Sequence, residues 1–396
     1  MTKADLSGGA PRLIRHSNVV AALQALFDQG QLSRAALARH LGLNRSSSGH
    51  IIAELLASDL VREVPDTAPQ TDTPVRAGRP GVRLELQPDA ACFVGVEIGV
   101  EHITTLRMNL KGTYSHCRIE PFDGRSVPVA IAVEQAVAQA FDGMPQDLRD
   151  SVEGFGLAVP AQIEEAGLIH TAPLLGWENE DLRSLVDLAL RSEFPVMIEN
   201  DANAFAFGES YCDRANRAGV TLFMVLESGV GGGIVIDGKL YRGGHGLAGE
   251  IGHMHIRDGA ELEEVLGRDH LLQRYRVANG GVPVSIRSFL DAVQRSDPQA
   301  VAIASDWAQD LAQAIVSACR LLDPNRVVLG GGLAALYPMV ATQVLNRMGE
   351  LQARTFPCPK IVVHKSAESG AAFGAACMLH QRFLSLENEM HLRGPK

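Results

Sequence analysis

The segment at residues 226–233 combines four glycines with one carboxylate, and this combination is the most informative chemistry in the sequence. Glycine-rich turns bind phosphate because their bare backbone N–H groups can approach an anion closely. Glu227, however, places a negative charge directly before Ser228 and Gly229. At ~4 Å and an effective dielectric constant near ~20, each pair of like charges costs on the order of 4 kcal/mol. The segment therefore resembles a phosphate-binding loop whose charge disfavours phosphate.

The composition favours a cytoplasmic α/β protein with more than one domain. A chain of 396 residues is long enough for two or three domains, and its hydrophobic content of 46% with only 5% aromatics suits α/β folds. The sequence contains no run of ~18 apolar residues and no apolar core of a secretory signal, so we expect no membrane span. The six cysteines are scattered without a Cys-x-x-Cys pair, which indicates reduced thiols.

The net charge of −10 is distributed unevenly along the chain. Residues 1–86 hold 10 basic and 8 acidic side chains, whereas the remainder holds 26 and 38. A mildly basic front end on an acidic body is consistent with a small nucleic-acid-binding module attached to a domain that binds something else.

Residues 19–58 have the pattern of a helix-turn-helix. Apolar residues recur at helical spacing in residues 19–27, and Ser33 and Asn44 are good N-caps for helices over residues 34–41 and 45–58. Gly42 stands where the tight turn between them needs a permissive backbone. We therefore predict a DNA-binding motif, with a plain three-helix packing motif as the alternative.

The start of the third predicted helix is suited to a DNA groove because its side chains are short, polar or basic. These residues are Arg45, Ser46, Ser47, Ser48 and His50.

A wing is predicted after this motif. Residues 60–64 and 82–86 read as two strands, joined by a wing or linker at residues 65–81 that contains Arg76 and Arg79. These arginines suit a narrow minor groove, where arginine is electrostatically favoured. The alternative is a solvated linker with two incidental arginines. We assign residues 1–86 to a winged helix-turn-helix domain and residues 87–396 to the body.

The body reads as two successive α/β halves. Strands are predicted at residues 93–100, 101–106, 154–159, 195–199, 222–226 and 326–329, and helices at 128–141, 182–192, 201–211, 301–322 and 370–384. Strand pairs followed by helices in two halves indicate a duplicated domain with a ligand-binding cleft between its lobes.

Four motifs of the body resemble those of the ROK family (repressors, uncharacterised reading frames and sugar kinases), specifically its transcription-factor branch. They are the Glu-Asn-Asp-Ala-Asn run at residues 199–203, the glycine-rich segment at 229–238, the Gly-Glu-Ile-Gly-His motif at 249–253 and the glycine turn at 330–332. The resemblance covers essentially the whole chain. It implies an N-terminal winged helix-turn-helix followed by a two-lobed, actin-like or sugar-kinase-like body.

The resemblance also implies a sugar site. In family members that bind sugars, the residues matching Asn200, Asp201, Glu250 and His253 contact sugar hydroxyls. Carboxylates and amides suit this task because they make paired hydrogen bonds with vicinal hydroxyls, and Asp201 could accept a hydroxyl proton in a phosphoryl transfer. The alternative for Asn200 and Asp201 is that they only cap the helix that begins there.

The phosphate loops depart from the pattern of the family's kinases. The first loop, which is Asp-x-Gly-x-Thr in the kinases, here has Glu97, Gly99 and Glu101 at the three defining positions. The second loop has Glu227 where the family usually has glycine. Both departures add or enlarge a carboxylate, so we expect no kinase activity, with an ATP-dependent sugar kinase carrying a DNA-binding head as the alternative.

The metal site and part of the sugar site of the family are also altered. Its zinc-binding cysteines are missing here, which leaves His253 and His270, with a nearby Glu263, as weak candidates, so we expect no metal and no cofactor. Leu174 and Leu272 replace polar residues, so the pocket has lost polar contacts. The ligand is a sugar or, as alternatives, a modified or less hydroxylated small molecule or no effector at all.

Taken together, the sequence predicts a transcriptional repressor. We expect it to bind double-stranded operator DNA as a homodimer or tetramer, under the control of a carbohydrate-like effector. A regulator controlled by a protein partner instead of a small molecule is a third hypothesis.

Overall fold

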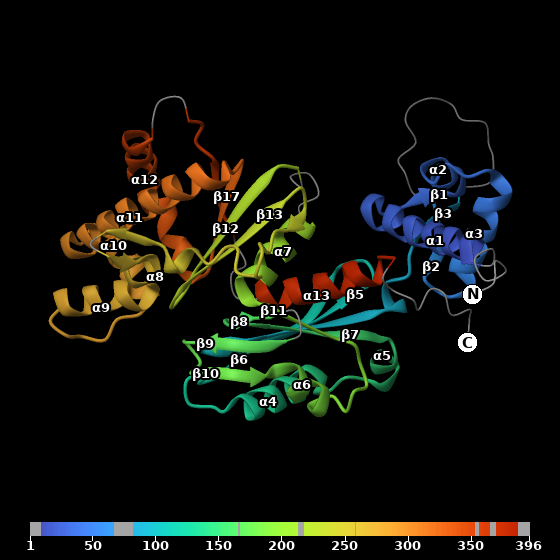
Figure 1. The fold of residues 1–396 in the computed structure, drawn as a ribbon, viewed down its shortest axis with the longest axis horizontal. Helices are drawn as coiled ribbons and strands as arrows, with labels where there is room; N and C mark the ends of the chain where they lie inside the picture. Colours follow the sequence, from blue (N-terminus) through green and yellow to red (C-terminus); the bar gives the residue numbers. More distant parts are fainter. Residues whose placement is uncertain are drawn as a thin grey trace.

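The computed structural model describes residues 9–66, 82–164, 167–212, 218–257, 259–352, 356–364 and 370–386, and Figure 1 shows their arrangement. A winged head at one end is followed by two lobes, each built on a five-stranded sheet. The predicted α/β fold class, a winged helix-turn-helix with a two-lobed body, is confirmed. Arg76, Arg79 and most of the predicted wing lie outside the described residues. Within those residues, no helix is long and apolar enough to cross a membrane.

The head combines a helix-turn-helix with a small sheet. Its elements are α1 (Gly9–Gln29), β1 (Leu32–Ser33), α2 (Arg34–His40), α3 (Arg45–Ala57), β2 (Val61–Pro65) and β3 (Val82–Leu86). The side chains of Ser33 and Asn44 accept hydrogen bonds from Ala36 N and Ser47 N, as their predicted roles as N-caps require. Strands β2 and β3 pair antiparallel, as expected for the two sides of a wing.

The first helix begins ten residues earlier than the apolar spacing predicted. Its extra turns carry Leu13 and Ile14, which are 63% and 62% exposed. Because this part of the helix buries no apolar face, periodicity could not reveal it.

The first lobe is built on the sheet β11-β7-β4-β5-β6. Its strands are β4 (Cys92–Ile98), β5 (His102–Asn109), β6 (Tyr114–Pro121), β7 (Val152–Val159) and β11 (Val196–Asn200). The lobe also contains a small sheet of β8 (Gln162–Ile163), β9 (Leu168–Ala172) and β10 (Trp177–Asp181), and the helices α4 (Val129–Phe141), α5 (Gln146–Asp150) and α6 (Leu182–Ala189).

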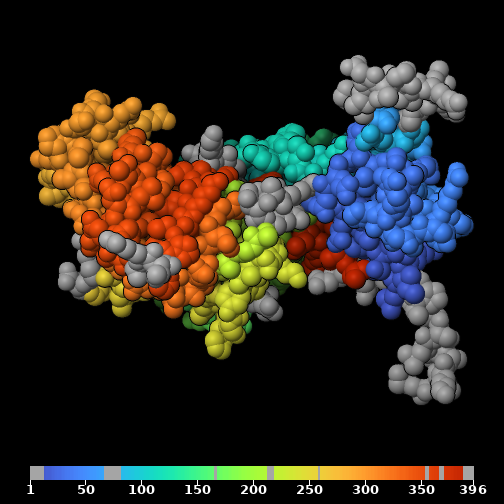
Figure 2. Space-filling view, turned by 90° about the horizontal axis from the view of Figure 1, so that it is seen from above, coloured from blue at the N-terminus to red at the C-terminus, as the bar shows by residue number. Residues whose placement is uncertain are grey.

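The second lobe is built on the sheet β14-β13-β12-β17-β18. Its strands are β12 (Val220–Leu226), β13 (Val230–Ile236), β14 (Lys239–Leu240), β17 (Arg326–Gly330) and β18 (Lys360–Val363), with a separate pair β15 (His255–Arg257) and β16 (Ala260–Glu261). Its helices are α8 (Leu262–Leu266), α9 (Arg268–Ala278), α10 (Ile286–Gln294), α11 (Pro298–Leu322) and α12 (Tyr337–Leu351). In Figure 2 the head and the helices α8–α10 stand at opposite ends of the molecule.

Two further helices, α7 (Asp201–Cys212) and α13 (Gly370–Phe383), lie against each other between the two sheets (Figure 1). Each is seated on one sheet through glycines. A Cβ added to Gly231 or Gly233 of β13 would meet the Cβ of an alanine of α7 at 2.8 or 2.5 Å. Only residues 227–229 therefore form the turn between β12 and β13, and the glycines that follow let a helix approach a strand. The prediction that 226–233 is one phosphate-type loop was wrong in this respect.

The head is attached to the body by a continuous apolar core and by polar contacts. The core contains Leu23 and Leu26 of α1 together with Met378 and Leu379 of α13. Glu85 of β3 is paired with Lys111 in the turn between β5 and β6 at 2.9 Å. Burial opposes ionisation of Glu85, but its hydrogen bonds with Lys111, Gln31 and Arg62 outweigh that effect and lower its pKa to about 2.

Candidate functional site

Asp201 lies where the two lobes meet, at the start of α7 directly after β11. Its Oδ1 accepts a hydrogen bond from Ala202 N at 2.8 Å. Burial raises its pKa to about 7, and the charges of Glu97 and Glu250 contribute in the same direction. The carboxylates of Glu97 and Glu250 therefore lie close enough to oppose the ionisation of Asp201, which is an arrangement that hydroxyl groups or a cation would relieve.

Asn200 makes the contacts of a helix cap. Its Oδ1 accepts a hydrogen bond from Asn203 N at 3.0 Å, and its Nδ2 donates to Ala161 O at 3.2 Å. The capping alternative is therefore real for this residue. The amide of Asn200 has a second N–H besides the one that it donates to Ala161 O, so capping and contact with a ligand are compatible.

Glu199 and Arg242 form an ion pair beside Asn200, and the sequence analysis did not predict this pair. The buried carboxylate of Glu199 forms an ion pair with Arg242 and accepts hydrogen bonds from Asn200 N at 2.9 Å and Asn203 Nδ2 at 3.3 Å. This pair ties the segment after β14 to the end of β11. The signal in the sequence was a glutamate inside one motif and an arginine inside the next.

Glu250 is the N-cap of the short 3₁₀ helix Ile251–His253, which ends at His253. His253 Nδ1 is 2.9 Å from Glu261 Oε2, whereas its Nε2 is 4.0 Å from Glu250 Oε2. The hydrogen bond with Glu261 raises the pKa of His253, while burial raises that of Glu250. Glu261 is a further partner that the sequence analysis did not identify.

The metal candidates are only partly brought together. Within the described ranges, the grouping with ligand-type atoms within 4.8 Å of one another consists of His253, Glu261 and Glu263. His270 is not in it and instead lines a hollow of about 440 Å³ on α9 with Gln273 and Arg274. His270 therefore does not lie with the other candidate ligands. The donors next to His253 are two carboxylates, of which Glu261 is also its hydrogen-bonding partner.

Glu227 links two glycine turns, at residues 227–229 and 330–332. Its Oε1 accepts a hydrogen bond from Gly332 N at 2.5 Å, and the backbone of the turn is closed by a bond from Glu227 N to Gly229 O at 3.0 Å. Burial raises the pKa of Glu227, although its side chain retains 42% of its exposure. A carboxylate of the protein therefore holds a backbone N–H of the kind that a phosphate would need.

Arg268, at the start of α9, balances this carboxylate and reaches across to the first lobe. Its guanidinium donates to Ser228 Oγ and to Glu101 Oε1, each at 2.6 Å, and its Nη1 is 3.6 Å from Glu227 Oε2. Arg125 of the first lobe lies 3.2 Å from Asp269 of α9. We call Arg268–Glu101 and Arg125–Asp269 the interlobe pairs. The sequence analysis did not single out Arg268.

His102 completes the group around the first loop. Gly99 N donates to His102 O at 2.9 Å, which closes the turn, and His102 Nε2 is 3.7 Å from Glu97 Oε1. That distance is too long for a hydrogen bond, and the nitrogen is buried without a hydrogen-bonding partner among the described residues. The nearby carboxylate of Glu97 raises the pKa of His102.

The predicted DNA-contacting residues lie on the first turns of α3. Arg45, Ser46 and His50 are exposed, and Ser47 is half-buried. Ser48 is buried, and its hydroxyl donates to Arg45 O at 3.2 Å. The structure thus turns Ser48 inward, and its prediction as a DNA-contacting residue was wrong because its place on the helix faces the core.

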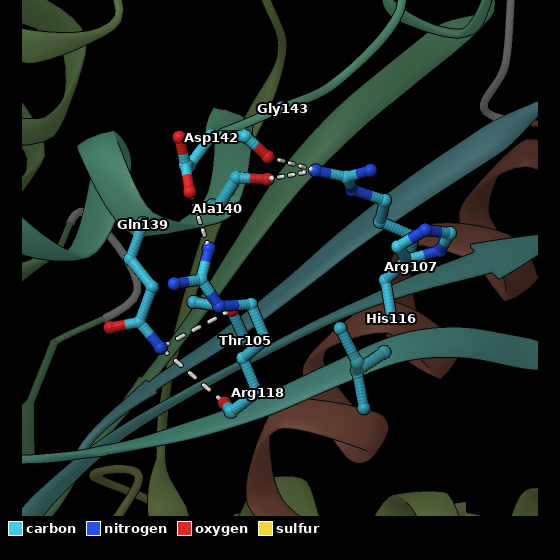
Figure 3. Close-up of a pocket in the computed structure, with 9 residues that line it drawn as sticks. Thr105, Arg107, His116, Arg118, Gln139, Ala140, Asp142 and Gly143 are labelled. Atoms are coloured by element: carbon cyan, nitrogen blue, oxygen red, sulfur yellow. Dashed lines mark hydrogen bonds and ion pairs between the residues drawn. The ribbon is translucent and has the colours of Figure 1, made fainter.

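A separate hollow of about 200 Å³ lies on the first lobe, lined by Arg107, Arg118 and Gln139 among others (Figure 3). The buried guanidinium of Arg107 donates to Ala140 O and Asp142 O, at the end of α4. It therefore satisfies carbonyl groups that a helix leaves without partners. This hollow contains none of the candidate site residues.

Known proteins resemble this chain in two ways. The ROK family profile matches residues 93–382. A xylose repressor of Caldicellulosiruptor bescii is 29% identical over 255 residues, and the match spans 63% of this chain and 61% of the relative. A xylose repressor of Bacillus spizizenii is 24% identical over 379 residues, which span 92% of this chain and 95% of the relative.

Sugar kinases are also among the relatives. An N-acetyl-D-glucosamine kinase of Vibrio cholerae is 30% identical over 251 residues, covering 58% of this chain and 82% of the relative.

Among solved structures, a ROK family transcriptional regulator described as a homologue of the Escherichia coli MLC protein superposes with a TM-score of 0.73 at 21% identity. It covers 95% of this chain and 100% of its own. This likeness shows a shared fold that includes the head.

The ROK family profile matches well over half of the residues of this chain, so the chain belongs to the ROK family.

Proposed function

We propose that this protein is a transcriptional repressor whose binding to operator DNA is controlled by a sugar. The observation that carries the proposal is a combination: a helix-turn-helix head stands on a sugar-kinase-like body in which Asp201 and Glu250 remain together while Glu227 occupies the phosphate turn. The full-length similarity to a xylose repressor, which includes the head, supports the proposal.

The head would bind DNA through the exposed residues of α3. Arg45 and His50 can reach base edges or phosphates, and Ser46 and Ser47 suit close approach to the duplex. Arg76 and Arg79 stay predicted minor-groove contacts. Two copies of the head in a homodimer or tetramer would read a palindromic operator. The protein would act in the cytoplasm, and its DNA-binding domain would end at residue 86.

The effector would bind where Asp201, Glu250 and His253 lie. Three carboxylates and an imidazole offer acceptors and a donor to sugar hydroxyls, and hydroxyl donors would relieve the repulsion among the carboxylates. Leu174 brings an apolar group to one side, next to a carboxylate: a Cβ added at Gly229 would meet Leu174 Cδ1 at 3.3 Å and Glu263 Oε2 at 3.2 Å. A sugar with an apolar or missing substituent on that side fits this chemistry. Control of DNA binding requires that the sugar favour one arrangement of the protein over another.

We further propose that the protein has no kinase activity and needs no cofactor. Glu227 and Glu97 would both repel the phosphates of ATP, and the hydrogen bond from Gly332 N is already used. One observation favours the alternative of a sugar kinase: the pKa of Asp201 is about 7, which suits a general base at neutral pH.

A thermal-shift screen of the purified chain tests the proposal. We would use D-xylose, D-glucose, N-acetyl-D-glucosamine and ATP with Mg²⁺, because a ligand that binds the folded state raises the melting temperature. In parallel, a random duplex library would be selected for binding. We expect a shift with at least one sugar, none with ATP, and a selected palindromic sequence. Sugar-dependent ATP hydrolysis or phosphorylation of the sugar would establish the kinase instead.

A further inference from the structure

Each of the two central helices is seated closely on one sheet. A Cβ added at Gly95 or Gly156 of the first sheet would meet the backbone oxygen of Ala372 or Ala375 of α13 at 2.1 or 2.7 Å. In the second sheet, Gly233 has the same relation to Ala206 of α7. By these contacts α13 is packed closely on the first sheet and α7 on the second.

The two helices meet through small residues over most of their length. A Cβ added at Gly208 would meet Gly374 Cα at 2.8 Å, and one added at Gly374 would meet Ala204 O at 1.7 Å. Backbone therefore faces backbone there, and one large side chain, that of Phe373, also lies 3.4 Å from the Cβ added at Gly208.

The interface changes character at its end nearest the head. Tyr211 of α7 has its hydroxyl 2.7 Å from Nδ1 of His380 of α13, and both side chains are buried. His380 Nε2 is 2.8 Å from Leu110 O. Since a carbonyl oxygen only accepts, Nε2 carries the proton and Nδ1 accepts from the tyrosine hydroxyl. This directional bond joins the helix of one lobe to the helix of the other.

Phe27 of the head lies on both of these rings. Its centroid is 5.3 Å from that of Tyr211 in a stacked arrangement and 4.6 Å from that of His380. On its other side, a Cβ added at Gly112 would meet Phe27 Cε2 at 3.0 Å. The first helix of the head thus packs against a place where large side chains link α7 and α13.

We propose that Phe27, Tyr211 and His380 form the relay by which the sugar site controls the DNA-binding head. Helix α7 begins at Asp201, in the proposed sugar site, and reaches Tyr211 after ten further residues, about 15 Å along its axis. A sugar that draws the lobes together displaces α7 along α13. The displacement alters the stacking of Tyr211 and His380, and Phe27 carries the change into α1. This inference rests on the proposed function and specifies how its site is regulated.

The relay is tested by separating three quantities in the full-length protein: the Kd for the selected duplex, the Kd for the sugar that gives the largest thermal shift, and the ratio of the duplex Kd with and without saturating sugar. The variants are Phe27→Ala, which removes the phenyl ring, and Tyr211→Phe, which removes only the hydroxyl. The matched controls are Phe141→Ala, whose ring stacks on Phe194 at 5.4 Å on the outside of the first lobe, and Tyr275→Phe, a buried tyrosine of the second lobe.

We expect both relay variants to keep the two separate Kd values within about threefold of wild type, whereas the ratio approaches 1. Allosteric couplings are commonly about 5- to 150-fold, so this loss is measurable. Amide hydrogen exchange of residues 20–29 should respond to the sugar in wild type and in the controls but not in Phe27→Ala. If Phe27→Ala does not fold, Tyr211→Phe carries the test.

Two results would overturn the inference, and they differ. A wild-type ratio that persists at full size in both relay variants contradicts the relay and leaves the proposed function intact. A wild-type protein in which no sugar alters either the duplex Kd or the exchange of α1 contradicts the proposed function itself, and the relay with it.

Discussion

At the scale of single residues, Glu227 distinguishes this chain from a phosphate-binding relative. Its carboxylate accepts the hydrogen bond of Gly332 N and is balanced by Arg268, so the turn already contains an anion. A nucleotide phosphate would have to displace that carboxylate and remain beside Glu97. The sequence alone revealed a negative charge that would repel phosphate, but not the hydrogen bond that holds the carboxylate of Glu227 in place.

Replacement Glu227→Gly should therefore create affinity for nucleotide. Removing one like charge is worth on the order of 4 kcal/mol at ~4 Å, so we expect ATP with Mg²⁺ to bind at least about 100-fold more tightly than to wild type. Isothermal titration calorimetry measures both affinities. Glu227→Gln is the matched control, since it removes the charge but keeps an acceptor for Gly332 N, and it should gain less. Tight ATP binding by the wild type would contradict this view of Glu227.

The carboxylates of the site also predict how stability depends on pH. The pKa of Asp201 is raised to about 7, so the folded protein holds this proton between about pH 4 and pH 7 while the unfolded chain has released it. Stability consequently falls as the pH rises through that window. The raised pKa values of Glu227, Glu250, His102 and His253 contribute with the same sign.

We expect Asp201→Asn to reduce this dependence. The fall in melting temperature between pH 5 and pH 7.5 should be smaller than in wild type by at least about 2 °C, which corresponds to roughly 1 kcal/mol in a domain of this size. Scanning calorimetry at the two values measures it. Asp291→Asn, an exposed aspartate of α10, should leave the fall unchanged. An unaltered pH dependence in Asp201→Asn would show that Asp201 titrates near its usual value.

Residues inside local motifs could be found from the sequence, whereas their distant partners could not. Asn200, Asp201 and Glu250 stand in local sequence motifs that resemble those of the ROK family. Arg268 contacts Glu101 across 167 positions, and His253 contacts Glu261 in a segment where the family's cysteines are missing. Such pairs depend on how the lobes fold together, which no local pattern encodes.

At the scale of elements, α3 is the surface through which the head is proposed to bind DNA. Arg45 is exposed at its first position, where the Asn44 cap also leaves backbone N–H groups facing outward. We expect Arg45→Ala to weaken binding of the selected duplex by about 1–3 kcal/mol in fluorescence anisotropy, without changing the melting temperature. Arg287→Ala, on exposed α10 at the far end of the molecule, is the control. Equal affinities of the two variants would argue against α3 as the DNA-reading helix.

Two elements that the sequence predicted closely have strong burial patterns. Helix α11 was expected over residues 301–322 and runs over Pro298–Leu322, and β12 was expected over 222–226 and runs over Val220–Leu226. Helices α8, α9, α10 and α12 were not predicted. Helix α9 has only a short apolar face around Leu271 and Tyr275, and α8 is only five residues long, so neither has a periodic pattern long enough to be recognised.

At the scale of the whole molecule, the interlobe pairs join the two lobes. Arg125, Asp269 and Glu101 are all about half exposed, so each pair contributes only about 0.2–1 kcal/mol. That is small against the free energy of unfolding but comparable with the difference between two arrangements of the lobes.

The double variant Glu101→Gln, Arg125→Ala should therefore separate the lobes without unfolding them. We expect a larger radius of gyration in small-angle X-ray scattering, a melting temperature within about 2 °C of wild type, and the same expansion in wild type at high salt. Arg347→Ala breaks a surface pair with Glu350 inside one helix and serves as the control. A radius of gyration equal to that of wild type would show that these pairs do not set the arrangement of the lobes.

The most direct test of the account is to titrate the wild-type protein with its selected DNA duplex in the presence and absence of sugars and of ATP with Mg²⁺. The account predicts that one sugar changes the affinity for DNA at least about fivefold, that ATP changes nothing, and that no ATP is consumed. An affinity for DNA that no sugar alters, together with sugar-dependent consumption of ATP, would contradict it and identify a kinase.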